Sequence, residues 1–168
     1  MTSARIAILI PCYNEAQTIE RVVREFRKEL PQATVYVFDN RSSDRTADLA
    51  RHAGAVVGHE PRQGKGHVIR TMFRQIHADV YVMVDGDGTY PAQSVHALVQ
   101  PVLDGTADMV IGSRLHPGSK SQFKPLNRFG NRLFRWLLNR WFGVGVTDLL
   151  SGYRAFNRRV VKCVPFMS

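Results

Sequence analysis

The sequence is poor in cysteine and has no long apolar run, and both features exclude whole classes of protein. Its 168 residues contain only Cys12 and Cys163, without CxxC or Cys/His spacing, so we expect free thiols and no structural zinc-type site. No stretch approaches the roughly 18 consecutive apolar residues that a membrane-spanning helix needs. After "MTSARIAILIP", Asn14 and Glu15 stand where a signal peptide would have its cleavage site, so this segment predicts a first strand.

Acidic residues are almost absent from the last third of the chain. Residues 1–108 carry 12 Lys/Arg and 13 Asp/Glu, whereas residues 109–168 carry 11 Lys/Arg and the single acid Asp148. The net charge of +9 therefore comes from the last third. Nucleic acid, phosphorylated ligands and anionic membrane surfaces all attract such a segment, and charge alone does not choose among them.

Apolar, strand-like runs alternate with amphipathic stretches along what we expect to be a single domain, residues 1–168. The expected strands are 4–10, 34–38, 55–58, 80–84 and 108–112, and the expected helices are 15–29, 43–53, 65–77 and 92–103. This alternation is typical of βαβ units, and it predicts an α/β fold with a mainly parallel, central sheet between layers of helices. Continuous runs such as "IAILI" and "VYVMV" fit strands that are buried on both faces.

Polar residues follow four of these strands at the point where each strand ends. "PCYNE" follows the first strand, "DNRSSD" the second, "DGDG" the fourth and "GSR" the fifth. In open α/β sheets, ligands bind outside the carboxyl ends of the strands. We therefore expect a binding site at this edge of the sheet.

Two aspartates separated by one glycine end the fourth apolar run, in "VMVDGDGTYP". Neighbouring carboxylates repel unless one takes a proton or a cation neutralises both. A hard divalent ion, Mg²⁺ or Mn²⁺, that is also held by phosphate oxygens would satisfy Asp85 and Asp87. A solvated turn is the plainer alternative, and the position at a strand end favours the metal site.

Two other segments are suited to a nucleotide diphosphate. Asp39 ends a strand, where it could accept hydrogen bonds from a base or ribose with help from Asn40; helix capping, with Ser43 as the cap, is the alternative. In "RQGKGHVIR", Lys65 and Gly66 open a helix whose N-terminus favours an anion, or else belong to a flexible turn. The glycine spacing is not that of a P-loop.

Six segments in this order resemble family 2 glycosyltransferases of the GT-A fold: "IPCYNEAQTI", "VFDNRSSDRT", "GKGHVIRTMF", "VMVDGDGTYP", "IGSR" and "TDLLSGYRAF". They are most similar to the dolichol-phosphate mannose synthase-like branch, whose members transfer sugars to polyprenyl phosphates. The resemblance implies a UDP- or GDP-linked sugar donor and a metal held by Asp85 and Asp87. We expect the catalytic residues to be Asp87, Asp148, Arg114 and Arg128. The resemblance further implies a nucleoside pocket lined by Pro11, Tyr13, Glu15 and Asp39, and phosphate contacts from Arg114 and Arg128.

The chain departs from the family pattern at three positions. Asn40 stands where many relatives have a second aspartate, Arg45 replaces a common glycine, and Thr89 stands where close relatives often carry glutamine. These departures bear on the identity of the base and on the coordination of the metal rather than on the class of chemistry.

The family expectation is direct, metal-assisted displacement with inversion at the sugar carbon. A hydroxyl acceptor would need a general base, and Asp148 is the one candidate after residue 108. A polyprenyl phosphate is already anionic and needs none. In that case Asp148 would orient Arg154, help to hold the metal, or form a plain ion pair with Arg154.

Residues 125–142 predict an amphipathic helix with a basic stripe, Arg128, Arg132 and Arg135, beside a broad face of leucines and aromatic residues. Tryptophans and arginines next to leucines suit a membrane interface, although such a helix could equally cover the sheet. We therefore expect a peripheral protein at the cytoplasmic face of an anionic membrane.

Three other functions remain open at this point: a nucleic-acid-binding domain, a nucleotide-sugar-binding module without catalysis, and a soluble glycosyltransferase with a carbohydrate or small-molecule acceptor. The pocket acids argue against nucleic acid as a partner, because they would repel its phosphates. Members of the dolichol-phosphate mannose synthase-like branch continue past "SGYR", so we expect this domain to be truncated. A homo-oligomer is also allowed.

Overall fold

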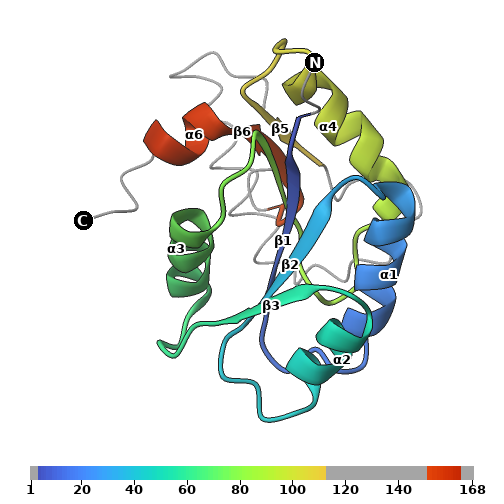
Figure 1. The fold of residues 1–168 in the computed structure, drawn as a ribbon, viewed down its shortest axis with the longest axis vertical. Helices are drawn as coiled ribbons and strands as arrows, with labels where there is room; N and C mark the ends of the chain where they lie inside the picture. Colours follow the sequence, from blue (N-terminus) through green and yellow to red (C-terminus); the bar gives the residue numbers. More distant parts are fainter. Residues whose placement is uncertain (1–3, 113–150, 164–168) are drawn as a thin grey trace, which may run out of the picture.

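The apolar runs of the sequence form the central strands of one sheet in the computed structural model, which describes residues 4–112 and 151–163 (Figure 1). The strands are β1 (Ile6–Cys12), β2 (Thr34–Asp39), β3 (Val56–His59), β4 (Val80–Met83), β5 (Met109–Ile111) and β6 (Arg154–Asn157). The helices are α1 (Ile19–Glu29), α2 (Thr46–His52), α3 (Lys65–Gln75), the short 3₁₀ helix η1 (Ala92–Ser94), α4 (Val95–Leu103) and α6 (Arg158–Cys163).

The sheet has the strand order β3-β2-β1-β4-β6-β5. Strands β1 to β4 pair in parallel, which confirms the predicted mainly parallel sheet. Strand β6 was not predicted: it lies between β4 and β5 and runs antiparallel to both. Its position places the preceding residues 151–153 beside the end of β4.

The helices form two layers on opposite faces of the sheet, as the three-layer prediction requires (Figure 1). Helices α1, α2 and α4 pack on the face to which β1 directs Ile6, Ile8 and Ile10. Helices α3 and α6 pack on the other face, to which β1 directs Ala7 and Leu9. Because β1 is buried on both faces, its sequence is continuously apolar rather than alternating.

Two predicted helices begin later than expected. Helix α1 begins at Ile19 rather than at residue 15, because Glu15 to Thr18 form a turn in which the Thr18 N–H donates to the Glu15 carbonyl over 3.0 Å. Helix α2 begins at Thr46 rather than at residue 43, and the expectation that Ser43 caps it is wrong. The Thr46 N–H instead donates to Asp44 Oδ1 over 2.9 Å.

The described ranges, 4–112 and 151–163, contain no helix that is both long and apolar enough to cross a bilayer. Cys12 is a buried free thiol and Cys163 an exposed one, as expected. The expected helix at 125–142 and the predicted site residues Arg114, Arg128 and Asp148 lie outside the described residues.

Candidate active site at the carboxyl ends of β1, β2 and β4

The register of the sheet brings the polar segments after β1, β2 and β3 to one edge. Cys12, the last residue of β1, is paired with Asp39, and Asp39 is paired with His59 at the end of β3. Strand β4 runs parallel to β1, so the segment from Asp85 leaves the sheet at the same edge. The predicted convergence of polar strand ends is therefore present for β1, β2 and β4, whereas most of the segment "GSR" after β5 lies outside the described residues.

Asn14 ties the loop after β1 to the loop after β2. Its side-chain oxygen accepts hydrogen bonds from the Ser43 N–H over 2.8 Å and from Ser43 Oγ over 3.2 Å, while its own N–H donates to Ser42 Oγ over 2.9 Å. The backbone of Asn14 has a positive φ of 56°, a conformation that asparagine tolerates better than most residues. Both loops are therefore held in one arrangement before any ligand binds.

A second set of contacts joins the same loops through Asp44 and Thr46. The Glu15 N–H donates to Thr46 Oγ1 over 2.8 Å, and the Ala16 N–H donates to Asp44 Oδ2 over 3.1 Å. Asp44 Oδ1 also accepts hydrogen bonds from the Thr46 N–H and hydroxyl. The hydrogen bonds to the Asp44 carboxylate, above all that from the Thr46 hydroxyl, lower the pKa of Asp44 below its usual value. Asp44 thus acts as a structural acid at the rim of the site.

Asp39 presents an unused acceptor to the site. Its Oδ2 accepts from the Ser42 N–H over 3.3 Å and lies 3.6 Å from His59 Nδ1. Its Oδ1 is buried and has no hydrogen-bond partner among the residues that the structure describes. A buried carboxylate oxygen without a donor is costly, so an N–H or O–H group of a ligand would be bound here.

Asn40 is engaged by the protein itself. Its side-chain NH₂ donates to the carbonyls of Glu60 and Arg62 over 2.9 and 2.8 Å, and its Oδ1 accepts from the Gly64 N–H over 2.8 Å. The sequence predicted that Asn40 assists in binding the base. The structure places its amide against residues 60–64, where it holds the loop that leads into α3.

Glu60 anchors the same loop from inside. Its side chain is buried, forms an ion pair with Arg62 Nε over 2.9 Å and accepts a hydrogen bond from the hydroxyl of Thr71 on α3. The hydrogen bonds from Arg62 and Thr71 lower the pKa of Glu60 to about 2. Together Asn40 and Glu60 fix the approach to Lys65.

Asp85 lies between a cation and a glycine. Lys65 Nζ, from the first residue of α3, forms an ion pair with Asp85 Oδ1. On the other side, Gly152 approaches so closely that a Cβ built on it would come within 2.2 Å of Asp85 Oδ2. The Gly152 N–H donates to the hydroxyl of Tyr90 over 2.7 Å, which fastens the turn before β6 to the segment after β4.

Asp87 closes a tight turn, in which its Oδ1 accepts hydrogen bonds from the N–H and the hydroxyl of Thr89 over 3.0 and 2.8 Å. Between the two aspartates, the Gly86 carbonyl accepts from Thr18 Oγ1 over 2.6 Å. A Cβ on Gly86 would come within 2.7 Å of Cys12 Sγ, so glycine is needed for this close approach. The acidic pair is thereby tied to α1 and to the end of β1.

The acids of the site affect one another electrostatically. Burial, followed by the charges of Asp87 and Asp85, raises the pKa of Glu15 above its usual value. Burial, followed by the charges of Glu15, Asp39 and Asp85, raises the pKa of the Cys12 thiol far above its usual value. The site therefore carries an excess of negative potential that favours a bound cation.

The donor set fits a hard divalent cation that is shared with a ligand. Within residues 4–112 and 151–163, no three His, Cys, Asp or Glu side chains gather closely enough to hold a metal by themselves. Asp85 and Asp87 provide carboxylate oxygens, which Mg²⁺ and Mn²⁺ prefer, and Mg²⁺ typically binds one or two carboxylates together with substrate phosphates. The residues present thus fit a metal whose coordination a diphosphate completes.

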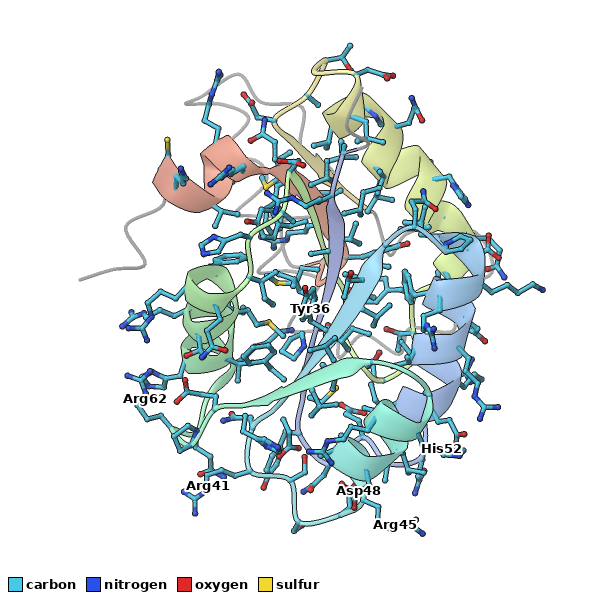
Figure 2. The ribbon with its side chains drawn as sticks, viewed as in Figure 1. Tyr36, Arg41, Arg45, Asp48, His52 and Arg62 are labelled. Atoms are coloured by element: carbon cyan, nitrogen blue, oxygen red, sulfur yellow. The ribbon has the colours of Figure 1, made fainter. Side chains whose placement is uncertain are left out.

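Exposed side chains lie on the loops that leave this edge of the sheet. Tyr13 follows β1 with an exposed fraction of 52%, which leaves its ring available to stack on a base, and Pro11 is half-buried beside it. In Figure 2 the exposed Arg41 and Arg45 project outward at the lower end of the molecule, and the exposed Arg62 projects outward on its left side.

Five predicted site residues therefore meet at this edge of the sheet: Glu15, Asp39, Lys65, Asp85 and Asp87. Gly66 follows Lys65 in the first turn of α3, and nothing lies within 4 Å of a Cβ built on it. Sequence reasoning gave no role to several residues that position the site, among them Asn14, Thr18, Glu60, Tyr90 and Gly152. Asn14 and Gly152 left a signal, as residue types that favour turns.

Residues 7–164 match the family described as "Glycosyl transferase family 2". Protein RfbJ of Shigella flexneri is 44% identical over 75% of this chain and 98% of its own length. Glycosyltransferase AglJ of Haloferax volcanii is 40% identical over 94% of this chain. This chain spans about half, 52%, of the length of AglJ. The undecaprenyl-phosphate mannosyltransferase of Micrococcus luteus is 30% identical over 95% of this chain and 69% of its own length.

The fold is also similar to that of solved structures. The crystal structure of glucosyl-3-phosphoglycerate synthase from Mycobacterium tuberculosis in complex with phosphoglyceric acid has a TM-score of 0.76 and 25% sequence identity; the match covers 94% of this chain and 58% of that chain. Another structure of that enzyme holds Mn²⁺, UDP-glucose and phosphoglyceric acid. The predicted GT-A arrangement is confirmed by these matches.

Proposed function

The chain belongs to glycosyl transferase family 2, and on that premise we propose that it transfers a sugar from a nucleotide-diphosphate sugar to a polyprenyl phosphate at a membrane surface. The proposed nucleotide-sugar donor rests on one observation: Asp39 Oδ1 has no hydrogen-bond partner among the described residues and lies on the same edge of the sheet as Asp85 and Asp87. The acceptor half is supported by the names of related enzymes, among them a polyprenol monophosphomannose synthase and a dolichyl-phosphate hexose transferase.

Asp39 selects the base in this proposal. A carboxylate oxygen accepts hydrogen bonds, so Asp39 Oδ1 favours a base with a ring N–H. Uracil and guanine carry such a group at the relevant edge, and cytosine has a lone pair there. Tyr13 stacks on the base, and a UDP- or GDP-linked sugar is the expected donor.

The diphosphate lies over Asp85 and Asp87. These carboxylates would hold Mg²⁺ or Mn²⁺, and such an ion would neutralise the charge that develops on the departing diphosphate. The Thr89 N–H and hydroxyl keep Asp87 in place, and Thr18 keeps the Gly86 backbone in place. Arg114, Arg128 and Asp148 remain predictions, with the two arginines contacting phosphate groups.

The transfer itself is a single displacement. A phosphate oxygen of the acceptor attacks the anomeric carbon of the sugar from the face opposite the diphosphate, and the bond between that carbon and the diphosphate oxygen breaks as the new bond forms. The electron pair of the broken bond leaves with the nucleoside diphosphate, so the configuration at the sugar carbon inverts. An anionic phosphate acceptor has no proton to lose, so Asp148 need not act as a general base in this reaction.

The basic last third of the chain supports a membrane location for this reaction. Residues 109–168 carry 11 Lys/Arg and one acid, and the expected amphipathic helix at 125–142 belongs to this segment. Each basic residue near an anionic bilayer contributes on the order of 1 kcal/mol to binding. We expect the lipid-linked acceptor to be met at that surface.

A transfer assay tests the proposal. The protein is incubated with Mn²⁺ and a radiolabelled sugar donor, either UDP-glucose or GDP-mannose, together with polyprenyl phosphate in detergent, and the label in the organic phase is counted. Label should enter the lipid fraction, and Asp87→Ala should abolish the transfer. Lipid without label, for every nucleotide-sugar that the protein binds, would contradict the proposed acceptor.

A phosphorylated small molecule is the second candidate acceptor. It is favoured by the similarity to an enzyme whose structure holds phosphoglyceric acid. Running the same assay with 3-phosphoglycerate in place of the lipid separates the two candidates. Label in an aqueous, glycosylated phosphoglycerate, and none in the lipid, would establish the phosphorylated small molecule as the acceptor.

A further inference from the structure

The ion pair between Lys65 and Asp85 occupies an acid that the proposed function assigns to a metal. Lys65 is the first residue of α3, and Asp85 follows β4, so two separate elements bring the charges together. An ammonium group on Asp85 Oδ1 and a divalent cation on the same oxygen would repel each other. Both cannot remain at this position when the site is loaded.

We propose that Lys65 is a resident cation that neutralises Asp85 in the empty site and is drawn away by the donor diphosphate, so that the metal and the nucleotide bind cooperatively. This inference rests on the proposed function, because it assumes a diphosphate-bearing donor. The lysine then contacts the diphosphate while the metal takes its place beside Asp85.

Asp85 is the partner that stays in place during this exchange. The side chain of Asp85 has an exposed fraction of 19%, and Gly152 lies directly against its carboxylate. Turning the carboxylate away from Lys65 would drive it into the backbone of Gly152, which the Tyr90 hydroxyl holds. The separation of the pair must therefore come from movement of Lys65.

Lys65 has the freedom to move. Its side chain has an exposed fraction of 52%, and it lies between Gly64 and Gly66. The φ of Gly64 is +124°, which a residue with a side chain rarely adopts, and no atom lies within 4 Å of a Cβ placed on Gly66. The chain around Lys65 is thus uncrowded, and a flexible lysine stem carries the charge to a new partner.

The destination of Lys65 is an anion near the start of α3. The first turn of α3 contains no acidic residue, so the helix offers Lys65 no alternative carboxylate there. The N-terminus of a helix favours phosphate oxygens, and a lysine at that position adds its own charge. A diphosphate between Asp85 and the start of α3 meets both requirements.

The charge balance favours joint entry of metal and nucleotide. Without ligand, Glu15, Asp85 and Asp87 are close enough for the two aspartates to raise the pKa of Glu15, and Lys65 offsets part of this repulsion. A metal that enters alone must displace Lys65 into water. A metal that enters with a diphosphate gives Lys65 a new anionic partner, which makes the exchange favourable.

The test measures Mn²⁺ binding in the absence and presence of nucleotide, by the electron paramagnetic resonance signal of free Mn²⁺. Without nucleotide, Lys65→Met should bind Mn²⁺ about fivefold or more tightly than the unaltered protein, within the usual range of coupling between sites. With Mn²⁺ present, UDP and GDP should bind to Lys65→Met about tenfold or more weakly, because the diphosphate has lost a cation. The cooperativity between Mn²⁺ and nucleotide therefore shrinks.

Two further variants keep the test decisive. Arg74→Met removes a positive charge from the exposed last turn of the same helix and should leave the affinity for Mn²⁺ unchanged. Lys65→Arg retains the charge and should keep Mn²⁺ binding as weak as in the unaltered protein. Mn²⁺ affinity without nucleotide that is equal or lower in Lys65→Met would overturn the inference, as would tight binding in Lys65→Arg.

Failure of this inference can be told apart from failure of the proposed function. The Mn²⁺ titration without nucleotide involves no sugar transfer, so its outcome depends only on the competition at Asp85. Sugar transfer together with unchanged Mn²⁺ affinity in Lys65→Met refutes the exchange alone. Tighter Mn²⁺ binding in Lys65→Met, together with no sugar transfer by the unaltered protein, refutes the proposed reaction and leaves the exchange in place.

Discussion

Gly152 lies against the carboxylate of Asp85, so closely that a Cβ on Gly152 would come within 2.2 Å of Asp85 Oδ2 and 2.7 Å of Asp85 Cγ. The contact joins the turn before β6 to the segment after β4, and the hydrogen bond from the Gly152 N–H to the Tyr90 hydroxyl fixes it. No side chain other than hydrogen fits at this position without moving the acid.

Replacing Gly152 by alanine should weaken metal-dependent nucleotide binding, because the new methyl group pushes the Asp85 carboxylate out of place. We expect the affinity for Mn²⁺ plus UDP or GDP to fall about 10- to 100-fold, as for other residues that orient a metal ligand. Isothermal titration calorimetry measures this change. Gly66→Ala adds a methyl group with nothing within 4 Å, so it serves as the control for thermal stability. Unchanged nucleotide affinity in Gly152→Ala would show that Asp85 tolerates displacement.

Asp39→Asn should weaken nucleotide binding without weakening the fold. The substitution removes an ionised acceptor, and hydrogen bonds to charged groups contribute about 1.5–3 kcal/mol, so affinity for UDP or GDP should fall roughly 10- to 150-fold. The ligand-free protein should melt at an unchanged or higher temperature, since the unpartnered buried carboxylate oxygen is gone. The amide NH₂ should also improve the binding of CDP relative to UDP.

Differential scanning fluorimetry with and without nucleotide separates the two effects of Asp39→Asn. Asp104→Asn, at an exposed carboxylate after α4, is the matched control and should change neither. A large loss of stability in ligand-free Asp39→Asn would mean that the carboxylate is structural.

Asn40→Asp should destabilise the protein, because the Asn40 amide is engaged by the loop of residues 60–64. The Asn40 NH₂ donates to the carbonyls of Glu60 and Arg62, and a carboxylate would face both carbonyls without a donor. We expect a loss of about 2–4 kcal/mol in the free energy of unfolding, measured by urea denaturation. Asn157→Asp removes an amide donor from an exposed pair with Asp108 and should cost less than about 1 kcal/mol. Equal losses in both variants would contradict the role assigned to Asn40.

The pKa of Glu60 predicts how stability changes in acid. Its folded-state pKa, about 2, is depressed below the ordinary glutamate value of 4.5, so the stabilisation by its ion pair with Arg62 is present above about pH 4.5. It is lost as the pH falls toward 2. Unfolding curves should therefore show stability decreasing over this window, and Glu60→Gln should be less stable at pH 7 but show a smaller decrease. Parallel curves for the two proteins would refute this assignment.

The order of strands and helices was predictable because each buried strand is a short apolar run between amphipathic helices. Strand β6 was not predictable, because "RAFN" has only four residues and its pairing with β4 depends on contacts far along the chain. The start of α1 was also missed. The turn from Glu15 to Thr18 depends on the Gly86 carbonyl, which accepts a hydrogen bond from Thr18 and which no local pattern reveals.

The acids of the site could be located from strand ends, but their partners could not. Asp39 and Asp85 follow apolar runs, so their edge of the sheet was clear from the sequence. The partnership of Asp85 with Lys65 joins residues that belong to different motifs. Asn40 looked like a ligand-binding residue because it adjoins Asp39, and only the structure shows that residues 60–64 engage its amide.

The insertion of β6 between β4 and β5 also sets an order of events during protein synthesis. The four parallel strands and helices α1 to α4 are complete once the chain has passed α4, whereas β6 and α6 come from residues 154–163. A nascent chain can therefore assemble the loops after β1 and β2 before Gly152 is available to pack against Asp85. The surroundings of Asp85 are complete only when β6 pairs with β4 and β5, which both precede it in the chain.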